Sequence, residues 1–171
     1  MKLQKIVSHL QKLHPKEIDL SLDRIKILCE KLGNPQDKIK AISVVGTNGK
    51  QSTINAIFSI LKEAKVKCNV YTSPHIQKIN ERFVFDNNII DDYELIDLFE
   101  EVEKINDQNP LTFFEALSAC YFYKAAQYPN NVNLIEAGLF HRFDATNILK
   151  SNLASIAVSY THLTLPTTPY V

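Results

Sequence analysis

One short stretch of the chain combines residue types and a spacing that suit phosphate chemistry. The apolar, β-branched run at residues 42–45 ends at Gly46, and Gly49 and Lys50 follow shortly after it. From residue 54 to residue 61, apolar side chains recur at helical spacing. This order of strand, glycine turn and helix start brings backbone N–H groups and a cationic side chain to one point, as polyphosphate binding requires.

Each part of the stretch has a chemical role to offer. The glycines let backbone N–H groups approach phosphate oxygens, and the helix N-terminus adds unsatisfied donors and partial positive charge. Lys50 can reach the β- and γ-phosphates, and the hydroxyl of Ser52 or Thr53 can bind Mg²⁺. The full G-x-x-x-x-G-K-[ST] spacing is not met, because Gly46 lies only three residues before Gly49. The structural alternative is a plain strand-to-helix turn with an exposed lysine.

Two further strand ends supply polar side chains. Residues 66–71 predict a second strand, which leads into a loop with Ser73 and Pro74, and residues 132–135 predict a third strand that ends in Glu136. Ligands of open α/β sheets bind at the carboxyl ends of the strands, and a carboxylate beside a phosphate loop is a usual magnesium ligand. The alternatives are an ordinary surface turn at Ser73 and an exposed strand-end acid at Glu136.

The remaining periodicity predicts how these residues are positioned. The predicted helices cover residues 1–13, 22–32, 50–64, 92–105 and 112–128. The predicted strands cover residues 42–45, 66–71, 132–135 and 153–158, with a hairpin-like turn at 86–88. Ser21 and Asp92 are candidate helix caps, and Thr112 with Glu115 forms a capping box that can also present Phe114 to a flat ring. A strand, helix, strand unit of this length implies parallel pairing with a right-handed crossover.

Composition excludes several classes of protein. The 171 residues include 19 basic and 19 acidic side chains without a basic block, so the electrostatic footprint of nucleic-acid binding is absent. Cys29, Cys68 and Cys120 are far apart and unpaired in sequence, which favours buried thiols in a reducing compartment. No apolar run approaches the length of a membrane span, and residues 1–13 predict an amphipathic helix instead of a signal peptide. We therefore expect a cytoplasmic protein without membrane or nucleic-acid partners.

Several motifs together resemble the Mur-ligase superfamily. The segment from Gly46 to Ser52 is similar to the Gly-Thr-Asn-Gly-Lys-Gly-Ser loop of folylpolyglutamate synthase and dihydrofolate synthase, with Gln51 in place of a glycine. Ser-Pro-His followed by Glu-Arg resembles the family's pterin-covering loop, and residues 112–115 resemble its Thr-x-Phe-Glu element. Residues 136–147 resemble Glu-Val-Gly-Leu-Gly-Gly-Arg-Leu-Asp-Ala-Thr-Asn, with Phe140 and His141 at the two adjacent glycines. The resemblance covers about residues 22–158.

The resemblance implies a set of site residues. For ATP it implies Thr47, Asn48, Gly49, Lys50, Gln51 and Ser52, with Lys50 as the catalytic residue. For the pteroate group it implies Thr112, Phe113, Phe114, Glu115, Phe143, Asp144 and Ala145, and also Leu22, Asp23 and Arg24. For Mg²⁺ it implies Ser73 and Glu136, with Ser52 as a further candidate.

The resemblance also implies a fold and a reaction. We expect a three-layer α/β domain with a mostly parallel sheet and a phosphate loop after its first strand. The implied reaction uses ATP and Mg²⁺ to join L-glutamate to dihydropteroate or to a folate through an acyl phosphate, in a monomeric enzyme. The alternatives are another Mur-type amino-acid ligase, or a nucleotide-binding fragment without catalysis. A panel comparing dihydropteroate with a UDP-muramyl acceptor would separate the two ligases.

The last residues differ from the rest of the sequence. Residues 1–158 are expected to form a truncated ATP-binding domain, without the family's glutamate-binding second domain. Residues 159–171 are rich in Thr and Pro and carry no Asp, Glu, Lys or Arg. Because the family's next motif is missing there, we interpret this segment as a non-native tail that derives from a frameshift or from translated adaptor DNA.

Overall fold

The computed structural model describes residues 2–12, 21–138, 144–150 and 152–158. The α-helices are α1 (Lys2–Lys12), α2 (Asp23–Lys31), α3 (Lys50–Glu63), α4 (Asp92–Asn106) and α5 (Phe113–Ala125). The strands are β1 (Lys40–Gly46), β2 (Cys68–Tyr71), β3 (Phe83–Phe85), β4 (Asn88–Ile89), β5 (Val132–Glu136) and β6 (Asn152–Val158). The short 3₁₀ turns within these described ranges are η1 (Pro35–Lys38), η2 (Ile79–Arg82) and η4 (Ala145–Ile148). The interpretation of residues 159–171 as a non-native tail lies outside the described residues.

The described strands form one six-stranded, mostly parallel sheet in the order β4-β3-β2-β5-β1-β6. β1 pairs in parallel with β5 and β6, and β2 pairs in parallel with β5. β3 pairs antiparallel with β2 and β4, as the predicted hairpin requires. The unit β1-α3-β2 is therefore parallel, as expected, but its two strands are not neighbours, because β5 lies between them.

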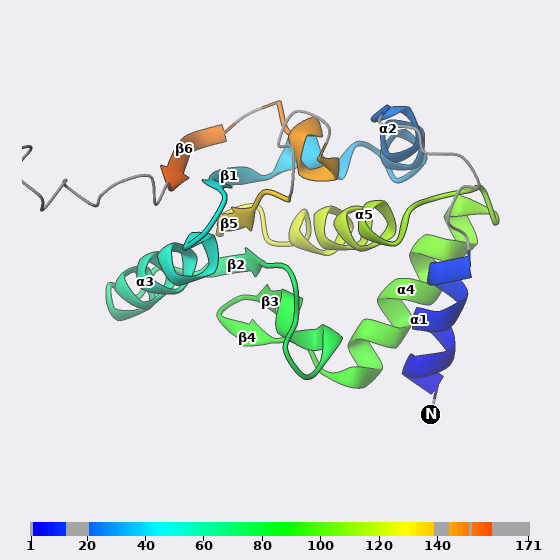
Figure 1. Ribbon diagram of the computed structural model, residues 1–171, viewed down its shortest axis with the longest axis horizontal. Helices are drawn as coiled ribbons and strands as arrows, with labels where there is room; N and C mark the ends of the chain where they lie inside the picture. The colour runs from blue at the N-terminus through cyan, green and yellow to red at the C-terminus, as the bar shows by residue number, and fades with distance from the viewer. Residues whose placement is uncertain (1, 13–20, 139–143, 151, 159–171) are drawn as a thin grey trace, which may run out of the picture.

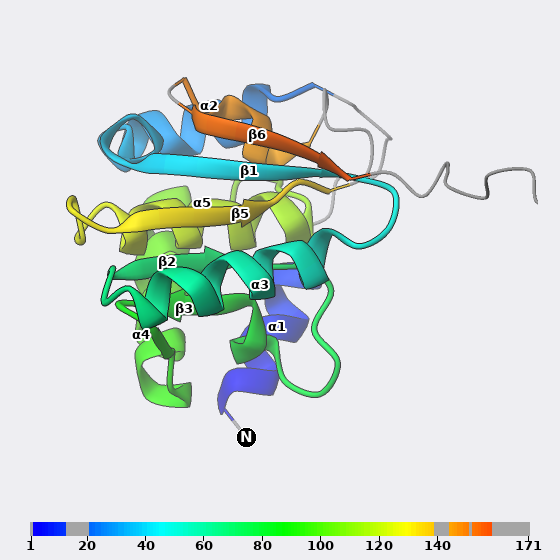
Figure 2. The same ribbon diagram turned by 90° about the vertical axis from the view of Figure 1, so that its left-hand side faces the viewer.

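Helices cover both faces of this sheet, which confirms the predicted three-layer α/β fold. α3 lies on one face, and α5 lies on the other, with α2, α4 and α1 around it (Figures 1 and 2). The smaller core packs Val44, Val70 and Leu134 of the sheet against Ile54 of α3. The larger core lies beneath α5 and contains a stack of aromatic rings, in which the Tyr71 and Tyr121 centroids are 4.9 Å apart. Burying these rings supplies much of the hydrophobic driving force.

Local chemistry explains where the helices begin. The predicted capping box of α5 is confirmed: Thr112 Oγ1 accepts from the Glu115 amide at 3.2 Å, and Glu115 Oε2 accepts from the Thr112 amide at 2.7 Å. The assignment of Asp92 as the cap of α4 is wrong, because Asp91 holds that position and accepts from the Glu94 amide at 2.8 Å.

The α2 cap also differs from the prediction. Leu22 is the N-cap residue and cannot accept a hydrogen bond through its side chain, so Ser21 does not cap the helix directly. The Ser21 hydroxyl instead accepts from the Asp23 amide at 3.4 Å, one position before the cap. At the other end, Gly33 and Asn34 take positive φ and stop the helix as expected.

All three cysteines are buried free thiols, as predicted. Burial raises the pKa of the Cys29 thiol to about 12, which keeps it protonated and unreactive. Among the helices in the described part of the chain, none has the length and apolarity needed to cross a membrane.

Candidate functional site

The carboxyl ends of β1, β5 and β2 meet at one edge of the sheet and position three of the candidate residues. Lys50 is the first residue of α3, directly after the turn that leaves β1, and Gly49 precedes it with φ of 78°. Glu136 is the last residue of β5, and Ser73 follows β2 after one further residue. Because β5 lies between the other two strands, Glu136 stands between the lysine and the serine.

Glu136 is the electrostatic centre of this edge. Its Oε2 accepts a hydrogen bond from the Ser73 amide at 2.9 Å, and its Oε1 lies 3.6 Å from Lys50 Nζ. Lys50 Nζ also donates to the Gly46 carbonyl at 3.0 Å. Burial raises the pKa of Glu136 above its ordinary value, while the Ser73 amide and Lys50 act in the opposite direction. The ionised carboxylate is therefore incompletely compensated by the protein.

A cavity of about 420 Å³ opens beside these groups. It is lined by Lys50, Ser73, Pro74, Phe114, Ala137, Gly138 and Asp144. These residues come from four of the separate stretches that the sequence singled out. The phosphate-loop lysine, the metal-ligand candidate Ser73 and the pteroate candidates Phe114 and Asp144 thus face one space.

Phe114 and Asp144 also line the cavity. Phe114 stacks on Tyr71 with centroids 5.9 Å apart, so its ring is supported from the core. Asp144 is 6% exposed and accepts from the Thr146 amide at 3.0 Å, which begins η4. A Cβ on Gly138 would stand 2.2 Å from Asp144 Oδ2, so only glycine leaves room for this carboxylate.

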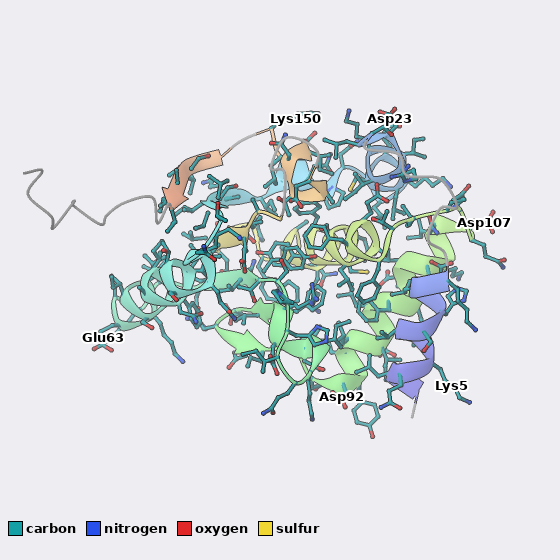
Figure 3. The ribbon with its side chains drawn as sticks, viewed as in Figure 1. Lys5, Asp23, Glu63, Asp92, Asp107 and Lys150 are labelled. Carbon is teal, nitrogen blue, oxygen red and sulfur yellow. The ribbon has the colours of Figure 1, made fainter. Side chains whose placement is uncertain are left out.

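The remaining pteroate candidates among the described residues do not line the cavity. Glu115 is 5% exposed, and its Oε2 accepts from Arg24 Nε at 3.1 Å, which ties α2 to the start of α5. Leu22 packs on the larger core, and Asp23 lies on the outer side of α2 with a largely exposed side chain (Figure 3). Neither of these two lines the cavity.

Other candidates are placed as follows. Thr112 and Phe113 are half-buried at the start of α5, and Ala145 is buried at the start of η4. Thr47 and Asn48 are exposed in the turn after β1, and Gln51 and Ser52 are exposed in the first turn of α3. Phe143, together with Phe140 and His141, lies outside the described residues.

The donor set fits a magnesium ion that is bound together with a nucleotide. Within the described ranges, no group of three or more His, Cys, Asp or Glu side chains could hold a metal by itself. Mg²⁺ commonly takes one or two protein ligands and fills its other positions with phosphate oxygens and water. Glu136, buried and incompletely compensated, and the neighbouring Ser73 match that mode of binding.

Glu81 and Arg82 are the Glu-Arg pair that follows Ser-Pro-His in the sequence, and the sequence alone assigns neither of them an individual role. Arg82 is 9% exposed, and its Nε donates to His75 Nδ1 at 2.8 Å. Glu81 accepts from three backbone amides of the loop that follows Ser73. The only signal in the sequence was the position of this Glu-Arg pair just after the loop.

The fold and the candidate site define the chain as an α/β domain of the phosphate-loop class, with its site at the carboxyl edge of a mostly parallel sheet. No protein-family model matches the sequence. Comparison with curated proteins is more specific. The chain is 37% identical over 160 residues to the dihydrofolate synthase/folylpolyglutamate synthase of Escherichia coli and 40% identical over 152 residues to that of Haemophilus influenzae. These matches cover 91% and 88% of the chain.

Solved structures agree with this result. A bifunctional folylpolyglutamate synthase/dihydrofolate synthase from Yersinia pestis, complexed with AMPPNP and Mn ion, superposes with a TM-score of 0.82 at 32% identity over 90% of the chain. E. coli FolC in complex with DHPP and ADP gives a TM-score of 0.80 at 32% identity over 89% of the chain. The chain is thus a homologue of the dihydrofolate synthase/folylpolyglutamate synthases, and the resemblance inferred from its motifs is confirmed.

The similarity concerns only part of these relatives. The chain spans 37% of the length of the E. coli relative and 34% of the H. influenzae relative. In the two superposed structures it corresponds to 38% and 37% of the solved chain.

Proposed function

We propose that this chain forms the nucleotide- and pteroate-binding part of an ATP-dependent ligase that joins L-glutamate to dihydropteroate or to a folate. In this proposal, residues 1–158 are its ATP-binding domain, and the enzyme acts as a monomer on small-molecule substrates. The observation that carries the proposal is the cavity beside Glu136, where Lys50, Ser73, Phe114 and Asp144 face one another.

The nucleotide would bind with its phosphates over the turn that precedes α3. Backbone N–H groups of Thr47, Asn48 and Gly49 would donate to phosphate oxygens at the start of the helix. Lys50 would exchange its present contact with the Gly46 carbonyl, 3.0 Å long, for the β- and γ-phosphates. The ammonium would then neutralise charge on the phosphoryl group that is transferred.

The pteroate group would occupy the opposite side of the cavity. The ring of Phe114, held by its stack on Tyr71, offers an apolar face to a flat heterocycle. Asp144 can accept hydrogen bonds from the N–H groups of such a ring. This arrangement would point the carboxyl group of the substrate toward the phosphate loop.

The reaction needs little covalent chemistry from the protein. An oxygen of the pteroate carboxyl group attacks the γ-phosphorus of ATP, ADP leaves, and the glutamate nitrogen then displaces phosphate from the acyl phosphate. A magnesium ion held by Glu136 and Ser73, with Ser52 as a further candidate, would supply charge neutralisation when bound. The protein's own contribution is to orient the two substrates in line.

Ligand binding by the chain itself tests the proposal. We expect Mg-ATP to raise the melting temperature, because a ligand at a hundred times its Kd stabilises the folded state by about 2.7 kcal/mol. Lys50→Ala should remove most of this shift, whereas Lys62→Ala, at the other end of α3, should leave it unchanged. Wild-type-like Mg-ATP binding by the Lys50 variant would contradict the assignment.

A second titration identifies the acceptor. Dihydropteroate should bind in the presence of Mg-ADP, and a UDP-muramyl precursor should not. The opposite preference would favour another Mur-type ligase. A Mg-ATP shift without binding of either acceptor would favour a nucleotide-binding fragment, which is a specific alternative because the chain spans only about a third of its relatives.

A further inference from the structure

The loop at residues 73–78 reaches the cavity at its first two residues, yet little apolar packing supports it. Ser73 and Pro74 line the cavity. Beyond them, the side chain of Ile76 is 82% exposed, and Gln77 and Lys78 are exposed as well. Because so few of its side chains are buried, the loop depends on hydrogen bonds for its shape.

The carboxylate of Glu81 supplies most of these hydrogen bonds. Its Oε2 accepts from the Ile76 amide at 2.8 Å, and its Oε1 accepts from the Gln77 and Lys78 amides at 3.0 and 2.8 Å. These hydrogen bonds lower the pKa of Glu81 and keep its carboxylate ionised, and the bond from the Ile76 amide has the largest effect. A residue that only capped η2 would bond near Lys78, whereas Ile76 and Gln77 lie outside this turn and belong to the loop.

Arg82 holds the loop from the buried side. Its Nε donates to His75 Nδ1 at 2.8 Å, so the imidazole accepts at Nδ1 and is neutral in this contact. The backbone carbonyl of Arg82 accepts from the Thr72 amide at 3.2 Å, and the Thr72 hydroxyl donates to the Glu81 carbonyl at 3.4 Å. Both ends of the loop are thereby joined to the same two residues.

We propose that Glu81 and Arg82 are positioning residues that hold the 73–78 loop in place and so keep Ser73 beside Glu136. Neither side chain lines the cavity, and both act through the loop. The link is the Ser73 amide, which donates to Glu136 Oε2 at 2.9 Å. The expected effect on a cation bound with the nucleotide rests on the function proposed above. The expected effect on the conformation of the loop does not depend on that function.

The variant Glu81→Gln tests the hydrogen bonds of Glu81 to the loop with little change in the shape of the side chain. The amide side chain has one oxygen, so in either orientation its NH₂ group faces at least one backbone N–H that the carboxylate now accepts. We expect the amides of residues 76–78 to exchange with solvent about tenfold faster, since hydrogen bonds to charged groups are the stronger ones. The Ser73 amide should also exchange faster, because Glu81 holds Ser73 in place through the loop. Residue-resolved NMR hydrogen exchange measures both effects.

Nucleotide titrations test the functional half. Wild-type protein should bind ADP more tightly with Mg²⁺ than without it. Glu81→Gln should retain its affinity for ADP alone and lose about tenfold of the gain from Mg²⁺, a size typical of groups that orient a metal ligand. A merely structural defect would instead weaken binding in both conditions.

Matched variants make the outcomes decisive. Glu63→Gln removes an equal charge at the far end of α3 and should change none of these measurements (Figure 3). If Glu81→Gln does not fold, His75→Phe removes the contact of the loop with Arg82 and should speed exchange at Ser73. Faster exchange at residues 76–78, with both Ser73 and the Mg²⁺ gain unchanged, would overturn the positioning role. Absence of nucleotide binding by the wild type would refute the proposed function, and the exchange data would then decide only the role of Glu81.

Discussion

Replacing Lys50 with methionine should lower the free energy of unfolding by about 2 kcal/mol at about pH 8, where Glu136 is ionised. Lys50 Nζ lies 3.6 Å from Glu136 Oε1, and the two side chains are only 14% and 4% exposed. At this distance the Coulomb attraction is about 4–5 kcal/mol for an effective dielectric constant near 20. Desolvation of both groups offsets much of it, so we expect a net coupling of about 1–2 kcal/mol, between the values for surface and fully buried pairs.

The remaining part of the loss comes from the hydrogen bond of Lys50 to the Gly46 carbonyl, which we set at about 0.5–1 kcal/mol. Thermal unfolding would report the total as a fall in melting temperature of about 4–8 °C for a chain of this size. Lys62→Met is the control, because that exposed lysine lies in the last turn of the same helix. It should change the melting temperature by less than about 2 °C.

A double-mutant cycle isolates the pair. In the Glu136→Gln background, Lys50→Met should cost only the hydrogen bond, because no buried carboxylate is left without its cation. The difference between the two backgrounds is the coupling energy. Costs that add within about 0.5 kcal/mol would show that Lys50 and Glu136 do not stabilise each other, and our view of the edge of the sheet would be refuted.

Three further predictions follow from the same contacts. Because burial raises the pKa of Glu136 in the folded state, the free energy of unfolding should fall as the pH rises above 4.5, the ordinary pKa of this carboxyl group. The melting temperature of Glu136→Gln minus that of the wild type should therefore grow from about pH 4.5 upward. A difference that stays constant with pH would contradict this prediction. Gly138→Ala should displace the Asp144 side chain and lower the free energy of unfolding, measured in urea titrations, by about 1–3 kcal/mol. The same change should weaken dihydropteroate binding more than Mg-ADP binding. Equal effects on both ligands would contradict a role of Asp144 in binding the pteroate group. Arg24→Met should leave the buried Glu115 carboxylate without its cation and cost about 2 kcal/mol, measured by thermal unfolding; an unchanged melting temperature would rule out a stabilising pair.

Much of the candidate site was predictable because its residues follow strand ends. Glu136 ends a recognisable apolar run, Ser73 lies just after another, and Lys50 follows a third after a short glycine turn; parallel strands bring such positions to one edge. The capping box at Thr112 and Glu115 was equally visible, because it depends on four consecutive residues. These signals depend on short stretches of sequence, so they can be recognised without knowledge of the fold.

Other features were not predictable from local patterns. Asp91 and Asp92 are adjacent and chemically identical, so only the backbone conformation decides which one caps α4. The contact of Arg82 with His75 depends on the path of a loop with little periodicity. The position of β5 between β1 and β2 is a matter of strand order, which no single segment encodes.

That strand order has a consequence for how the protein is made. β1, α3 and β2 are complete by Tyr71, but they share no ladder of hydrogen bonds until the strand that ends at Glu136 enters between them. A nascent chain that stops before Val132 would therefore leave both edges of β1 and one edge of β2 unpaired, and such edges are prone to misassociation. β5, the strand that lies between β1 and β2, also carries Glu136, the carboxylate of the candidate site. Assembly of the sheet and completion of the candidate site should thus occur in one late step of synthesis.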